Sequence, residues 1–123
     1  FFNAVRELKS GIGKLLLHAR REHSRIAVLY SQPDLLAAEL FARVAPNAKF
    51  AGAHNFWTEH EALLKGMRDL GYQYQHVSYV DLEQGRLSRA DYDIVVLPLA
   101  TCLSDNQVAT LRRFVESGGT LIV

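Results

Sequence analysis

Cys102, the single cysteine of the sequence, follows a run of apolar residues and precedes a predicted helix, where a nucleophile could stand. A thiol at such a turn is activated by the positive end of the following helix. A nucleophile elbow needs small neighbours, however, whereas Cys102 lies between Thr101 and Leu103, and no histidine follows it. We therefore interpret Cys102 as a small, half-buried apolar side chain, with a thiol enzyme that uses Cys102 as an alternative.

The five histidines do not have the spacing of a metal site. His60-Glu61 resembles the start of an H-E-x-x-H motif, but the position of the second ligand is Leu64, which cannot bind zinc. His54 and His60 are six residues apart, which places them on different sides of a helix. We expect structural or solvent-exposed roles for the histidines and no metal ion.

Four carboxylates gather around one predicted loop: Asp81, Glu83, Asp91 and Asp93. Acid–base catalysis needs two carboxyl groups at a defined separation, so we interpret these four as solvated loop charges. The segment Gly11-Ile12-Gly13-Lys14 resembles part of a phosphate-binding loop, but it lies within a helical pattern and follows no strand. The sequence therefore predicts no catalytic residue and no cofactor.

Two large aromatic residues, Phe56 and Trp57, directly precede a helix that we expect to begin at Thr58. Trp57 would then stand just before the N-cap, where an apolar side chain packs back onto the helix as a hydrophobic staple. We expect Phe56 and Trp57 to form this staple or a contact between subunits. The alternative is a sugar-stacking or other ligand-binding role.

Strands alternate with helices along the chain and would position these residues. Apolar runs at 25–30 and 94–97 predict strands covered on both faces, and residues 120–123 begin another. The alternating pattern at 72–80 predicts a strand near a sheet edge. This order predicts an α/β fold, a doubly wound and mostly parallel sheet with helices on both faces, in a flavodoxin-like arrangement.

Three helices connect these strands, and each has an apolar stripe that we expect to face the sheet. The first begins at Ser31-Gln32-Pro33-Asp34 and ends at Pro46-Asn47, with the stripe Leu36, Leu40, Phe41 and Val44. The second runs from a Thr58–Glu61 capping box to Gly71, with the stripe Leu63, Leu64, Met67 and Leu70. The third runs from a Ser104–Gln107 capping box to Gly118-Gly119, with the stripe Val108, Leu111, Phe114 and Val115.

The first part of the chain, residues 3–22, predicts a helix with a break near Ser10-Gly11. The charged tract 20–24 is the expected junction. We interpret residues 1–23 as a helical linker from a preceding domain. Residues 24–123 form the α/β domain, which we expect to be truncated at its C-terminal end because the sequence stops within a predicted strand.

The composition narrows the class of protein. A chain of 123 residues with 49% hydrophobic residues can bury one domain core, and a net charge of +1 argues against nucleic acid as a partner. The longest apolar runs are four or five residues, far too short to cross a membrane. One cysteine fits a reducing, cytoplasmic compartment.

Four segments occur in a particular order: RIAVLYS at 25–31, Trp57 leading into LLKGMRDLGY at 63–72, DYDIVVLPL at 91–99, and FVESGGTLIV at 114–123. In this order and spacing, residues 24–123 resemble the beta-galactosidase trimerisation domain of glycoside hydrolase family 42 and related hydrolases. That domain is similar in fold to class I glutamine amidotransferases. Residues 3–22 resemble the helical segment that joins the hydrolase barrel to it.

The resemblance implies a non-catalytic trimerisation or assembly domain that supports the catalytic barrel of a beta-galactosidase-like parent, with Phe56 and Trp57 as a possible subunit contact. The amidotransferase nucleophile would fall beyond Val123, and residues 98–101 lack the glycine pair of an oxyanion loop, so the resemblance implies no catalysis by this chain. The alternative is an independent flavodoxin-like module that binds a small molecule.

Overall fold

Four parallel strands form the centre of the structure, a computed structural model that describes residues 2–19, 22–44 and 53–123. The strands are β1 (Ile26–Tyr30), β2 (Tyr74–Ser78), β3 (Ile94–Val96) and β4 (Thr120–Ile122). Their order in the sheet is β2-β1-β3-β4, and every pair is parallel. The predicted doubly wound α/β fold is confirmed, and β2 lies at an edge as its alternating pattern predicted.

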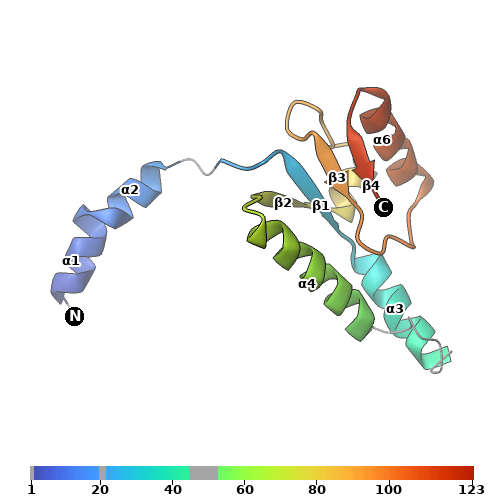
Figure 1. The fold of residues 1–123 in the computed structure, drawn as a ribbon, viewed down its shortest axis with the longest axis horizontal. Coiled ribbons are helices and arrows are strands. Elements are labelled where there is room, and N and C mark those ends of the chain that lie inside the picture. Colours follow the sequence, from blue (N-terminus) through green and yellow to red (C-terminus); the bar gives the residue numbers. More distant parts are fainter. Residues whose placement is uncertain (1, 20–21, 45–52) are drawn as a thin grey trace.

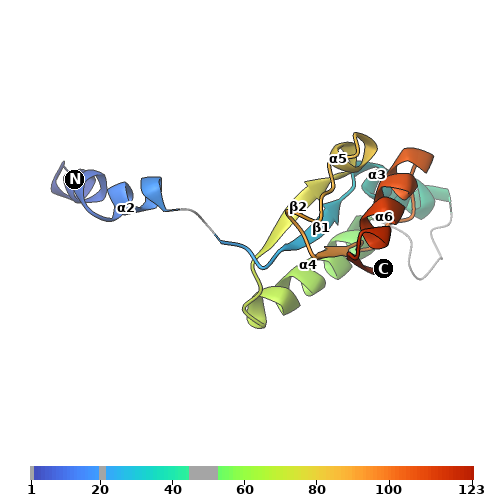
Figure 2. The same cartoon turned by 90° about the horizontal axis from the view of Figure 1, so that it is seen from above.

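Helices cover both faces of this sheet (Figures 1 and 2). Between β1 and β2 the chain forms α3 (Gln32–Val44) and α4 (Ala53–Asp69), and α4 packs its apolar side chains on one face of β1 and β3. The opposite face is covered by α5 (Tyr79–Glu83) and α6 (Asp105–Glu116), which bury Leu82, Leu111 and Phe114 against β1 and β3. The central strand β1 is therefore buried on both sides, which explains its unbroken apolar run.

The first two helices, α1 (Phe2–Ser10) and α2 (Ile12–His18), stand away from the sheet (Figures 1 and 2). The predicted break between Ser10 and Gly11 is confirmed. A side-chain carbon on Gly13 would lie 1.9 Å from the carbonyl oxygen of Leu8, so the backbone can change direction here only because that residue is glycine. Neither helix has a buried residue. The core of the predicted junction, residues 20–21, lies outside the described residues.

The predicted inward stripe of α3 is wrong. Leu36, Leu40, Phe41 and Val44 are between 58% and 70% exposed, and the residue of this helix that is buried is Asp34. The reason is visible in Figure 1, where α3 extends beyond the carboxyl end of the sheet, so its large apolar side chains have no strand beneath them. The predicted helix end at residues 46–47 lies outside the described residues.

Helix α4 begins earlier than the sequence pattern suggested. It starts at Ala53, so Thr58 lies within the helix, and both the Thr58–Glu61 capping box and the Trp57 staple are wrong. Phe56 is 3% exposed and continues the buried side of the helix by one turn, so its burial favours the earlier start. Leu63 and Leu64 pack on the sheet as predicted, whereas Leu70 is 75% exposed because it lies past the helix end.

Glycine ends α4 and α6 where the sequence predicted. Gly71 has φ +81°, and its N–H donates to the Arg68 carbonyl while the Tyr72 N–H donates to the Met67 carbonyl, both at 2.9 Å. These two bonds form a Schellman motif, which needs the left-handed backbone that glycine adopts freely. The same motif ends α6, where Gly118 has φ +91°.

Capping boxes begin α5 and α6. The Ser104–Gln107 box of α6 is confirmed, whereas α5 was expected to be strand and loop although Ser78 and Asp81 have the same spacing. Within α6, Leu111 is buried but Val108 and Val115 are 40% and 44% exposed, because they lie beside β4, where the sheet ends. No helix within residues 2–19, 22–44 and 53–123 is long and apolar enough to cross a membrane.

Candidate functional site

The carboxyl ends of β1 and β3 are the first place to look for a site. Ligands of open parallel sheets bind beyond the carboxyl ends of the strands, at the point where the strand order reverses. In the order β2-β1-β3-β4 this point lies between β1 and β3. The segments that meet there are the start of α3, with Asp34, and the loop after β3, with Thr101 and Cys102.

Asp34 holds that loop. It is 1% exposed, and its Oδ1 accepts hydrogen bonds from the backbone N–H groups of Thr101 and Cys102, each at 2.6 Å, and from the Thr101 hydroxyl at 3.0 Å. The loop includes Leu99 at φ +51°, a left-handed conformation that is costly for a branched side chain. The sequence analysis placed Asp34 at the start of the helix and did not predict this role. An acidic residue shortly after a buried strand is the signal that could have indicated it.

Cys102 is half-buried, as predicted. Its sulfur lies 3.7 Å from the Thr101 hydroxyl, and no hydrogen bond within the described part of the chain joins it to a histidine. A cavity of about 440 Å³ beside it is lined by Tyr79, Glu83 and Gln107. Glu83 accepts hydrogen bonds from Ser104 and Asn106, and no hydrogen bond within the described residues joins it to the thiol. The arrangement resembles a braced loop rather than a nucleophile with its base.

Two of the four loop carboxylates, Asp81 and Glu83, remain accessible to solvent and also accept hydrogen bonds at helix starts. Ser78 donates from its N–H and hydroxyl to Asp81, and these bonds hold the pKa of Asp81 below its ordinary value. The Ser104 hydroxyl and the Asn106 amide likewise lower the pKa of Glu83. Both groups stay ionised and serve as acceptors, so neither is prepared for general acid catalysis.

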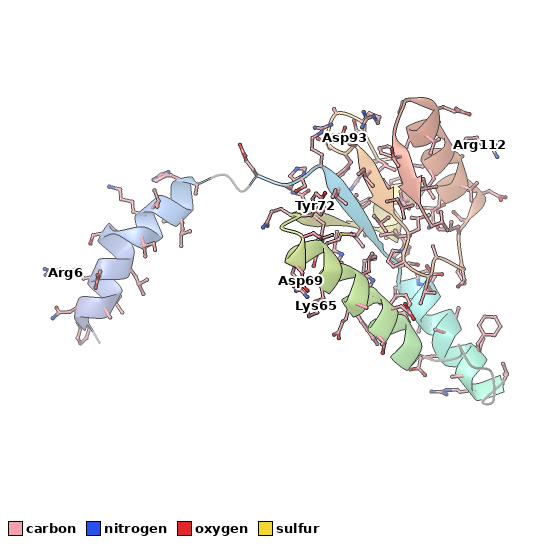
Figure 3. The ribbon with its side chains drawn as sticks, in the orientation of Figure 1. Arg6, Lys65, Asp69, Tyr72, Asp93 and Arg112 are labelled. Carbon is pink, nitrogen blue, oxygen red and sulfur yellow. The ribbon has the colours of Figure 1, made fainter. Side chains whose placement is uncertain are left out.

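Asp93 is bound in the same way, at the other end of the sheet (Figure 3). Its carboxylate accepts hydrogen bonds from Arg25, at 2.8 Å, and from Arg89, and these two bonds lower its pKa. The Arg25 guanidinium also donates to the carbonyls of Arg89 and Ala90, so this cluster ties the start of β1 to the loop before β3. Because the cluster joins two distant segments of the chain, it favours a structural role.

The second candidate site is an open groove of about 970 Å³ between α4 and the neighbouring face of β1 and β2. Because side chains alternate along a strand, Tyr30 of β1 and His76 of β2 point toward α4. From α4, Trp57, Glu61 and Arg68 border the groove, since residues three and four apart share one side of a helix.

A group of rings forms one wall of this groove. His60 stacks on Phe56 and on His76, with centroid distances of 5.8 Å and interplanar angles of 15° in both pairs. Trp57 is nearly perpendicular to Phe56 and to His60, and lies 6.5 Å from Tyr30. His60 is 3% exposed, its Nδ1 has no hydrogen-bond partner within the described residues, and burial, followed by the neighbouring His76, lowers its pKa.

The sequence predictions for these residues have mixed outcomes. The structure buries Phe56 and leaves Trp57 40% exposed, so only Trp57 of the two is available at the surface. His60 has a structural position, as expected, while the side chain of His54 lies outside the described residues. Within residues 2–19, 22–44 and 53–123, no group of three or more His, Cys, Asp or Glu side chains could hold a metal ion.

Fold and geometry together define a doubly wound, flavodoxin-like α/β domain. Asp34 holds the loop after β3 in place, and an open groove with an aromatic wall lies beside α4. No known protein-family model matches the sequence, and no curated protein matches it. Among solved structures, the chain is similar to the beta-galactosidase from Bifidobacterium adolescentis, with a TM-score of 0.59 and 24% sequence identity. The likeness covers 83% of this chain and 40% of that one, so the chain spans less than half of its neighbour.

Proposed function

We propose that this chain is a non-catalytic assembly domain of a beta-galactosidase-like glycoside hydrolase, which associates with copies of itself and supports the catalytic barrel of its parent. The single observation that carries the proposal is the exposed apolar face of α3, formed by Leu36, Leu40, Phe41 and Val44. Covering apolar side chains that gather on one side of a helix lowers the free energy, so such a face favours association with a partner. The likeness in fold to a beta-galactosidase supports the choice of parent.

A second copy of this chain is the occupant that we propose for the α3 face. Glu39 and Arg43 are both exposed and follow one border of the face, four residues apart, so each copy offers a positive and a negative group beside its apolar stripe. Such a border can pair with a surface of mixed charge on another copy. The resemblance implies three copies, and the single cysteine fits a cytoplasmic location.

Sedimentation velocity over a range of concentrations tests this proposal. The wild-type chain should form a species larger than the 13.8 kDa monomer. Leu40→Glu should weaken association by about tenfold or more, because burying a leucine contributes about 1.5–3 kcal/mol. The matched control is Leu70→Glu, an exposed leucine just past the end of α4 and outside the α3 face, which should leave association unchanged. A chain that remains monomeric at every concentration would contradict the proposal.

The second candidate is an independent flavodoxin-like module, which the groove beside α4 favours. The end of β1 and the residues that follow it, Tyr30-Ser31-Gln32, contain no glycine-rich phosphate loop. This sequence argues against a flavin or a nucleotide as the ligand. A thermal-shift panel of flavin mononucleotide, NAD and ATP separates the two candidates, since binding to the folded form raises the melting temperature. A clear shift with one of these compounds would favour the module.

A further inference from the structure

The groove beside α4 is long as well as open. Trp57 and Arg68 both border it and stand eleven residues apart on α4, which is about 16 Å along the helix axis. A small ligand occupies only one part of a groove of this length, whereas a helix of about three turns can lie along all of it. The apolar side chains of such a helix then fill the groove between its charged borders. The dimensions of the groove therefore favour a helix as its occupant.

Helix α3 of another copy has the dimensions and the chemistry of this occupant. Its exposed apolar side chains extend from Leu36 to Val44, about 12 Å along the helix axis, and so fit within the length of the groove. The groove offers them the 40% exposed Trp57, together with Tyr30 and Leu64. Leu36 and Val44 remain 61% and 70% exposed within their own chain, so the α3 that enters the groove comes from a second copy.

The charges of the two surfaces match when the two helices run antiparallel. Glu39 and Arg43 border the α3 face and are about 6 Å apart along α3, while Glu61 and Arg68 border the groove and are about 10.5 Å apart along α4. In the antiparallel orientation Glu39 meets Arg68 and Arg43 meets Glu61. The remaining difference of about 2 Å at each end is within reach of these long side chains. A parallel orientation would instead place like charges together, which is unfavourable.

Lys65 also borders the groove, but it forms a 2.5 Å ion pair with Asp69 of its own helix, and Figure 3 shows the two side chains together. Glu61 and Arg68 are therefore the border charges that meet a second copy. We propose that the α3 face of one copy binds in the α4 groove of the next, antiparallel to α4, so that the copies associate head to tail. This inference rests on the proposed assembly function and names the surface that receives the α3 face.

A head-to-tail contact uses two different surfaces of each chain, whereas a self-complementary contact would bury α3 against α3 and leave the groove empty. Mixing two variants of the full chain distinguishes these arrangements. Leu40→Glu disrupts the α3 face and keeps the groove, while Trp57→Glu disrupts the groove and keeps the α3 face. In sedimentation velocity each variant alone should associate at least about tenfold more weakly than wild type. Their equimolar mixture should form a species of two chains and none larger, because one intact pair of surfaces remains.

Charge reversal tests the antiparallel orientation without touching the apolar contact. Arg68→Glu should weaken association by about fivefold, and Glu39→Arg in the same chain should restore it, because the pair is then re-formed with its signs exchanged. The matched control is Glu59→Arg, a charge reversal at an exposed residue of α4 that does not border the groove, which should leave association unchanged. Circular dichroism confirms that each variant is folded.

The outcomes separate this inference from the assembly function. A wild-type chain that stays monomeric at every concentration overturns both. If the wild-type chain associates, the inference alone is overturned when Trp57→Glu associates as tightly as wild type or when the mixture of the two variants stays monomeric; association of α3 with α3 would then remain. It is also overturned if Glu59→Arg weakens association as much as Arg68→Glu, or if Glu39→Arg does not restore the association that Arg68→Glu weakens.

Discussion

Removing the Asp34 carboxylate should destabilise the domain more than any other single change at the switch point. Asp34 Oδ1 accepts three hydrogen bonds, two from backbone N–H groups at 2.6 Å and one from the Thr101 hydroxyl at 3.0 Å. Asp34→Ala leaves these donors without their acceptor and releases a loop in which Leu99 adopts a left-handed conformation.

The magnitude follows from these contacts. A donor that loses a charged acceptor costs about 1–3 kcal/mol when it stays buried. Thr101 is exposed, so water can reach its amide, whereas the amide of the half-buried Cys102 is less accessible. We expect Asp34→Ala to lower the free energy of unfolding by about 2–4 kcal/mol, a large part of the about 5–15 kcal/mol typical of a domain. Asp34→Asn keeps one acceptor oxygen and should cost about half as much.

Urea unfolding of the full chain, followed by circular dichroism, measures this loss. Glu59→Ala, an exposed acidic residue of α4 outside the α3 face, is the control and should change stability by less than about 0.5 kcal/mol. The native-state rate of Cys102 alkylation gives a second readout, because a released loop should expose the thiol more often in Asp34→Ala. An Asp34→Ala variant as stable as the control, with an unchanged alkylation rate, would refute the reasoning.

Three further outcomes are expected. The pKa of His60 is lowered from 6.5, so the unfolded chain binds that proton more readily; the free energy of unfolding should fall as the pH drops below about 6.5, and His60→Phe should remove this dependence in urea titrations. Gly66 has open space around its α-carbon, so Gly66→Ala should raise stability by about 0.5–1 kcal/mol, whereas Gly119→Ala would place a carbon 2.2 Å from Phe114 and should lower it by about 1–3 kcal/mol in the same assay. The lowered pKa of Asp93 contributes stability above its ordinary value of 3.8 that is lost as pH falls further, so Asp93→Asn should flatten acid unfolding followed by circular dichroism; a curve identical to wild type would contradict this.

The elements that the sequence determined are those set by neighbours a few positions away. The apolar runs of β1 and β3, the Ser104–Gln107 capping box and the glycine at position 71 act through bonds and contacts within about one turn or one strand. The alternation of such strands with helices was enough to predict a doubly wound parallel sheet, because parallel strands need helical crossovers of one hand.

Tertiary structure decided the features that depend on distant residues. The start of α4 at Ala53 is favoured by the burial of Phe56, which the local sequence pattern did not predict. The apolar side chains of α3 are exposed because this helix extends past the sheet. The bond from Asp34 to the loop at Thr101 spans 67 positions, and the groove joins α4 to strands on either side of it in the sequence. The sequence analysis weighed His60 and Trp57 separately and placed Asp34 only at the start of a helix. The order of the strands determined which neighbours each of the three met, because packing brings together side chains that the local pattern cannot relate.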